Sequence, residues 1–134
     1  MSIKVVAVSA AAALIAGVAV AQGVPEVKVQ ATRVIASGMT AKTVGRTSSG
    51  VPIKDITLSY GVTSEGLDLS TNTGATAFEQ RVKDAADQAC KDISRQYPDA
   101  TPSDAVCAKA ATDQAMVRVH ELVTAAEKTR VATK

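Results

Sequence analysis

The chain has 134 residues, a formal net charge of +2, two tyrosines, one phenylalanine and no tryptophan. A chain of this length can hold one domain with a single thin core. Its charge is close to neutral and its basic residues are dispersed, which argues against a nucleic-acid-binding protein. We therefore expect one small domain with no nucleic-acid partner.

The first 21 residues have the pattern of an export signal. Lys4 precedes an apolar run over residues 5–20, and Ala19-Val20-Ala21 matches the small-x-small cleavage rule. The alternative is a buried or membrane-spanning helix, but the run is shorter than the about 20 residues that a span requires. We expect cleavage between Ala21 and Gln22, which leaves a periplasmic or extracellular protein with no stable membrane anchor. Both of these compartments permit disulfides.

Two stretches alternate apolar and polar residues in the manner of half-buried strands. The first runs from Val27 to Thr32, and Val34-Ile35 either continues it or starts a turn. The second is the strongest strand pattern in the chain, with four apolar side chains at alternate positions: Ile56, Leu58, Tyr60 and Val62. We expect its apolar face to pack against helices.

The segment between these strands is less regular. Ser37-Gly38 indicates a break, Lys42–Arg46 is compatible with a short strand, and Thr47–Gly50 is a turn cluster. The alternative is that the Ser/Thr/Gly-rich stretch over residues 37–50 is mobile.

A first helix is predicted from about residue 70. Ser70, Thr71 or Thr73 can act as its N-cap, and it should end near Ser94 because Tyr97 precedes a proline. Its apolar positions recur at spacings of three and four, which indicates one buried stripe: Phe78, Val82, Ala85, Ala86, Ala89 and Ile93.

A second helix is predicted after a short loop. Thr101 has the character of an N-cap, Pro102 suits the first helical position, and Asp104 places a negative charge in the first turn. Its stripe is rich in alanine: Cys107, Ala111, Ala115, Val119, Leu122 and Ala126. Alanine buries little area, so the two helices need further stabilisation.

The two cysteines can supply it. Cys90 precedes the inter-helix loop by about as many residues as Cys107 follows it, so both come level in an antiparallel pair. A disulfide here would contribute about 3 kcal/mol on the chain-entropy model. A redox pair is the functional alternative, but there is no Cys-x-x-Cys motif and no nearby histidine. Free thiols and intermolecular pairing also remain open.

The element order predicts an α+β fold of two layers. We expect a small antiparallel sheet of two or three strands, packed on a disulfide-stapled antiparallel helix pair. Residues 22–54 would hold the N-terminal strand and the mobile segment, and residues 55–130 a strand followed by the helical hairpin.

From about Asp55 to Ala126 the sequence resembles the UrcA family. An ordered set of short segments carries the resemblance: Ile56–Tyr60, Leu67–Thr71, Gly74-Ala75, Arg81-Val82, Ala85-Ala86, Cys90, Cys107, Ala110-Ala111 and Ala115. The resemblance implies a small exported protein of a Gram-negative bacterium with two spaced cysteines and no established activity. Residues 61–66 depart from the family pattern, so the resemblance predicts no conformation for the loop before Asp68.

No residue cluster indicates catalysis. The single histidine, His120, lies away from the apolar stripe, and Glu121 is not spaced to share a metal with it. Glu65 and Asp68 form a small acidic patch without the ligand spacing of a calcium loop, so Asp68 is expected to support the helix entry. No nucleophile elbow or phosphate-binding glycine loop occurs. We expect no catalytic residue, metal ligand or cofactor.

Three functional hypotheses remain. The first is a non-catalytic structural or interaction module with an unknown protein or envelope partner. The second is an envelope metal- or ligand-binding protein of a stress response, using Glu65, Asp68 and His120. The third is a redox protein using Cys90 and Cys107.

Overall fold

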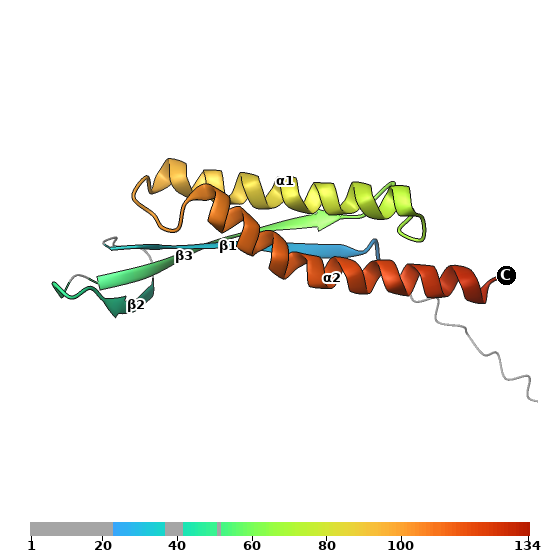
Figure 1. The fold of residues 1–134 in the computed structure, drawn as a ribbon, viewed down its shortest axis with the longest axis horizontal. Coiled ribbons are helices and arrows are strands. Elements are labelled where there is room, and N and C mark those ends of the chain that lie inside the picture. Colours follow the sequence, from blue (N-terminus) through green and yellow to red (C-terminus); the bar gives the residue numbers. More distant parts are fainter. Residues whose placement is uncertain (1–22, 37–41, 51) are drawn as a thin grey trace, which may run out of the picture.

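The computed structural model describes residues 23–36, 42–50 and 52–134. Three strands and two helices follow in the order β1 (Glu26–Ile35), β2 (Lys42–Arg46), β3 (Pro52–Thr63), α1 (Asn72–Gln96) and α2 (Asp104–Ala132). The helices lie on one side of the sheet, and α2 runs back diagonally across β1 (Figure 1). The expected α+β fold with two layers is confirmed.

The sheet is antiparallel, with the strand order β1-β3-β2. β1 pairs with β3 along the whole length of β1, from Glu26 opposite Thr63 to Ile35 opposite Lys54. β2 pairs with the start of β3, and a register shift falls between Thr43 and Gly45. The turn before β3 closes through a hydrogen bond of 2.9 Å from the Gly50 amide to the Thr47 carbonyl. Among the described residues the sheet therefore has three strands.

β1 positions the core because every second side chain of the strand is buried. Val27, Val29 and Ala31 are buried, and the same parity continues to Arg33 and Ile35. The opposite face of the sheet is polar and exposed, with the Thr32 and Thr57 hydroxyls 3.1 Å apart. One face of an antiparallel sheet packs on the core while the other meets solvent, as the alternation predicts.

α1 begins where the sequence indicates. Thr71 is the N-cap, and its hydroxyl accepts a hydrogen bond of 3.1 Å from the Gly74 amide. The Asp68 carbonyl lies so close to Gly74 that a Cβ there would sit 2.0 Å from its oxygen. The turn before α1 is thus folded tightly onto the first helical turn, and glycine is required for that approach.

α2 begins later than predicted. Its N-cap is Ser103, and Thr101 is not a cap. Thr101 instead pairs with the outer edge of β1, through hydrogen bonds of 2.7 Å and 2.9 Å that its carbonyl and amide make with Val34. This extended pairing keeps residue 101 out of the helix, and the helix starts after Pro102. The prediction that Thr101 caps α2 is therefore wrong.

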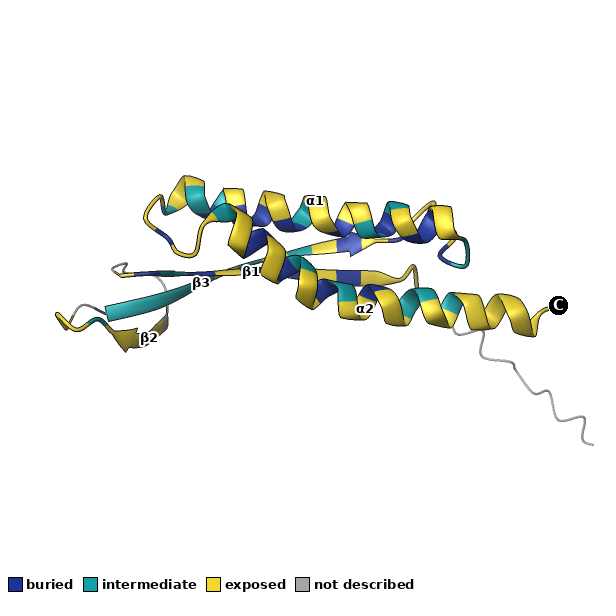
Figure 2. Ribbon diagram, viewed as in Figure 1, coloured by how far each residue is buried: buried dark blue, intermediate teal, exposed yellow. Residues whose placement is uncertain are grey.

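Two adjoining clusters form the core. The first joins β1, β3 and both helices around Phe78, whose side chain is fully buried, and the second surrounds the two cysteines. The predicted stripes are buried in α1 and in the first half of α2. Beyond Val119, no residue of α2 is fully buried, and the last turns extend past the sheet (Figure 2). This overhang has half-buried apolar side chains at Leu122, Val123 and Ala126.

Other predictions fall partly outside the described residues. The signal segment, its cleavage between Ala21 and Gln22, and the break at Ser37-Gly38 lie there. Within the segment over residues 37–50, Lys42–Arg46 forms β2, which agrees with the short strand that its sequence allows.

Candidate functional site

A disulfide joins the two helices, as predicted. The Cys90 and Cys107 sulfurs are bonded, and their Cα atoms are 6.0 Å apart, within the usual range for a disulfide. Both residues are buried, and Cys90 is fully so. A buried disulfide is shielded from attacking thiolates, which favours a structural role over redox exchange.

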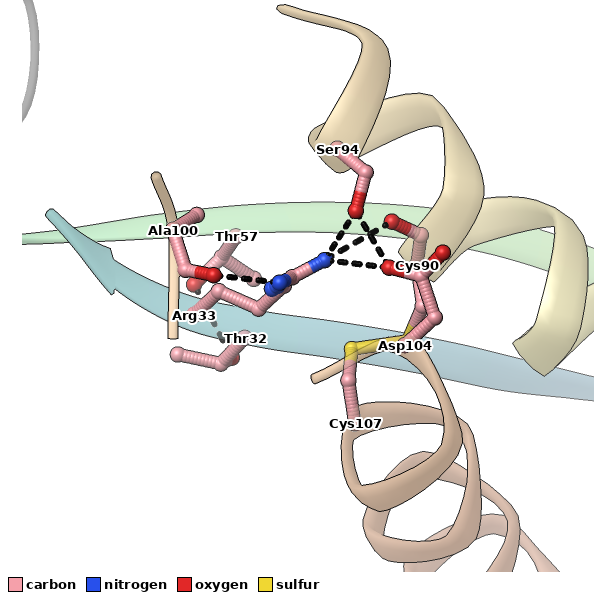
Figure 3. Close-up of a disulfide and its surroundings, with 8 residues drawn as sticks. All are labelled: Thr32, Arg33, Thr57, Cys90, Ser94, Ala100, Asp104 and Cys107. Atoms are coloured by element: carbon pink, nitrogen blue, oxygen red, sulfur yellow. Dashed lines mark hydrogen bonds and ion pairs between the residues drawn. A yellow bond between two sulfur atoms is a disulfide. The ribbon is translucent and has the colours of Figure 1, made fainter. Parts of the chain in front are cut away.

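Arg33 is a buried cation beside this disulfide. It occupies an inward-facing position of β1 and is only 4% exposed. Figure 3 shows its guanidinium reaching toward the end of α1, the inter-helix loop and the start of α2. Nη1 lies 2.6 Å from the Asp104 carboxylate and 3.4 Å from the Cys90 carbonyl, and it also donates to the Ser94 hydroxyl. Nη2 donates to the Ala100 carbonyl.

This cluster ties four chain segments together with one side chain. A buried guanidinium is tolerated only when it is paired and hydrogen-bonded. Here Asp104 supplies the charge and two backbone carbonyls supply further acceptors, while Nε has no partner among the described residues. The hydrogen bond from Ser94, followed by Arg33, holds the pKa of Asp104 below its ordinary value. The carboxylate therefore stays ionised beside Arg33 at neutral pH.

A second polar contact joins the sheet to α1. The Tyr60 hydroxyl on β3 donates to Asp92, which also accepts a hydrogen bond of 2.8 Å from Gln88 and pairs with Arg95. Tyr60 is half-buried at the margin of the second core cluster. The hydrogen bond between its hydroxyl and the Asp92 carboxylate gives each group a partner, so we interpret this contact as one that holds α1 on the sheet.

Asp68 has the role expected of a turn residue. Its Oδ1 accepts hydrogen bonds from the Ser70 amide, at 2.9 Å, and from the Ser70 hydroxyl, at 2.6 Å. These bonds lower the pKa of Asp68, and the positive charge of Arg130 adds to the effect. Glu65 contributes its backbone carbonyl, which accepts a hydrogen bond of 2.9 Å from Arg81.

His120 lies apart from both acidic residues of that patch. Its side chain is 69% exposed, and Nε2 is 4.0 Å from the Glu79 carboxylate. Within the described ranges, no three His, Cys, Asp or Glu side chains are placed to hold one metal ion. The structure thus does not bring Glu65, Asp68 and His120 together.

An open groove lies between the turn before α1 and the overhanging end of α2. Its volume is about 580 Å³, which lies within the range of ligand-binding sites. Its lining includes six apolar residues from the position just before β1, the turn and α2: Pro25, Leu67, Leu69, Leu122, Ala125 and Ala126. The sequence pattern did not predict this groove, since only the fold brings the turn beside the last turns of α2.

The rim of the groove is polar and has both signs of charge. Arg130 donates one hydrogen bond of 3.1 Å, from Nη1 to the Ser70 carbonyl, and lies near enough to Asp68 to lower the pKa of its carboxyl. In the described part of the chain, Oδ2 of Asp68 has no hydrogen-bond partner. Ser64 also lines the groove; it is 4% exposed, and its hydroxyl has no partner among these residues.

Comparisons of the chain with protein-family models, curated proteins and solved structures find no match. In the ranges that the structure describes, no helix is both long enough and apolar enough to cross a bilayer.

Proposed function

We propose that the protein is an exported, non-catalytic binding module of the cell envelope and a member of the UrcA family. The signal-like N-terminus and the buried disulfide support export, because disulfides persist in oxidising compartments. The ordered segments between Asp55 and Ala126 support the family assignment. The protein's binding surface is the groove between the turn before α1 and the end of α2.

The contrast between this groove and the polar clusters carries the proposal. Arg33, Asp104 and Asp92 make contacts between elements of the fold: Arg33 donates to Asp104, and Asp92 accepts from Tyr60. The groove instead places half-buried apolar side chains beside Oδ2 of Asp68 and the Ser64 hydroxyl, which have no hydrogen-bond partner in the described part of the chain. Concave apolar surface with a few convergent polar groups is typical of a binding site.

Site-specific photo-crosslinking in the native envelope tests this function. A photoreactive residue replacing Ala125, inside the groove, should give one discrete adduct. The same residue replacing Val117, which is exposed on α2 outside the groove, should give none. The adduct should vanish when Ala126→Trp fills the groove. Equal labelling from both positions, or no adduct from Ala125, would reject the groove as the binding surface.

A further inference from the structure

The groove combines three features that constrain what it binds. Much of its lining is apolar, it also holds a cation and an anion with unused hydrogen-bonding capacity, and the largely buried residue Ser64 lines it. Each feature selects a different part of a ligand. The ligand class inferred from them rests on the proposed function, since it concerns the same groove.

The apolar lining fits a single apolar chain. The wall supplied by α2 extends from Leu122 to Thr133, which is roughly 16 Å at the helical rise per residue. Leu67 of the turn and Leu122 of α2 both line the groove, and the next lining residues of α2, Ala125 and Ala126, have small side chains. An open groove that follows α2 over this length accommodates one extended chain laid along the helix.

The rim selects the charge of the head group. Arg130 uses one N–H group on the Ser70 carbonyl, and the guanidinium has five N–H donors in all. Asp68 uses only Oδ1 within the described part of the chain, so Oδ2 remains an acceptor. The Asp68 carboxylate would repel a purely anionic head group, and the Arg130 guanidinium would repel a purely cationic one. A head with both charges matches both residues.

We propose that this groove binds a single-chain amphiphile with a zwitterionic head group, of the lysophospholipid type. The chain lies over Leu67, Leu122 and Ala126. The anionic group of the head accepts from Arg130, and its ammonium group donates to Oδ2 of Asp68. The Ser64 hydroxyl bonds to a polar atom near the junction of head and chain.

Calorimetric titration with amphiphiles of one chain length, below their micelle concentrations, tests this assignment. The probes are lauroyl-lysophosphatidylethanolamine, lauroyl-lysophosphatidylglycerol, dodecylammonium and dodecyl maltoside, with phosphatidylcholine vesicles as the membrane-surface arm. The zwitterionic lysolipid should bind roughly tenfold more tightly than the other three single-chain probes, the equivalent of one charge-assisted hydrogen bond. The vesicles should not bind.

Matched variants locate the binding. Arg130→Gln and Asp68→Asn should each weaken binding of the zwitterionic probe about tenfold, and Asp68→Asn should strengthen binding of the anionic one. Asparagine keeps an oxygen for the Ser70 amide, so the turn is preserved. Ala126→Trp should abolish binding. Ala110→Trp and Arg118→Gln, which alter exposed positions of α2 outside the groove, should leave it unchanged.

The outcomes separate this inference from the proposed function. Equal or tighter binding of the anionic or neutral probe would overturn the zwitterionic assignment. Binding to the vesicles would show that the groove recognises a membrane surface and not a free amphiphile. If no amphiphile binds but Ala126→Trp still abolishes the envelope crosslink from position 125, the ligand class is wrong and the binding module stands. If Ala126→Trp changes neither measurement, both proposals fail.

Discussion

The Arg33 guanidinium lies 2.6 Å from the Asp104 carboxylate, and this ion pair joins the buried face of β1 to the first turn of α2. Because β2, β3 and α1 all lie between Arg33 and Asp104 in the sequence, the pair fixes how the chain closes on itself. It also lies directly beside the disulfide (Figure 3). The end of the domain opposite the groove is therefore held by one covalent and one ionic contact.

Arg33→Ala should destabilise the fold by about 2–4 kcal/mol. The substitution removes a buried cation and leaves the Ala100 and Cys90 carbonyls without their donor. Urea unfolding at neutral pH measures the loss. The control is Arg118→Ala, which breaks an exposed pair with Glu121 and should cost less than about 1 kcal/mol. Equal losses for both variants would show that the buried cluster stabilises the fold no more than a surface pair.

Stability should fall in acid as Asp104 and Asp68 become protonated. Both carboxyls have a pKa below the ordinary value of 3.8, Asp104 through Ser94 and Arg33, and Asp68 through Ser70. A group whose pKa is lowered by folding stabilises the native state above its unfolded pKa, and this contribution is lost as pH falls through the folded pKa. The decline should thus lie below about pH 4.

Urea titrations of the wild type, Asp104→Asn and Asp68→Asn at neutral pH and in acid, below the ordinary pKa of a carboxyl, check this dependence. Each variant should be less stable than the wild type at neutral pH, and the gap should narrow in acid. A gap that is constant with pH would contradict the assignment of these two carboxyls.

Removal of the disulfide should cost about 2–4 kcal/mol, because it restores loop-closure entropy to the unfolded chain. The double variant Cys90→Ala, Cys107→Ala avoids leaving one buried thiol behind. Thermal unfolding under oxidising conditions gives the comparison. A melting temperature equal to that of the wild type would show that the bond does not staple the helices.

Phe78→Ala should cost about 3–5 kcal/mol, since the ring is the largest fully buried side chain among the described residues and its loss leaves a cavity. Chemical denaturation measures this loss. Val117→Ala, on the exposed face of α2, is the matched control and should change stability by less than about 0.5 kcal/mol. A small effect at Phe78 would mean that α1 presents a different face to the sheet.

Gly74→Ala should destabilise the protein, although alanine is normally favoured over glycine in a helix by about 1 kcal/mol. The added Cβ would lie 2.0 Å from the Asp68 carbonyl oxygen, so the turn before α1 has to move. Gly45→Ala, in β2, places its Cβ where no atom lies within 4 Å and should cost little. Thermal unfolding of the two variants measures the steric effect, and a stabilised Gly74→Ala would contradict the tight turn.

Local pattern was sufficient for most of the fold. Alternation located β1 and β3, helical spacing located both buried stripes, and hairpin symmetry paired Cys90 with Cys107. The start of α2 could not be read locally, because Thr101 has the character of a cap but pairs with Val34 across the fold. Long-range backbone pairing prevailed over local propensity at that position.

The candidate site was much harder to predict. Arg33 follows Val27, Val29 and Ala31 at the same alternate positions of β1, so strict alternation would have predicted that Arg33 is buried. Its charge, taken alone, suggests the opposite, that the side chain faces solvent. The groove has no local signal at all. Its walls come from a turn and a helix end that are far apart in the sequence, and only their packing brings Leu67 beside Leu122.

The most direct test of an exported, stapled domain is the intact mass of the protein from the native envelope fraction, measured with and without reduction and alkylation. We predict a chain that begins at Gln22, is lighter by two hydrogens than its reduced form, and takes up alkylating reagent only after reduction. A chain that retains Met1, or that has two thiols open to alkylation before reduction, would contradict this prediction.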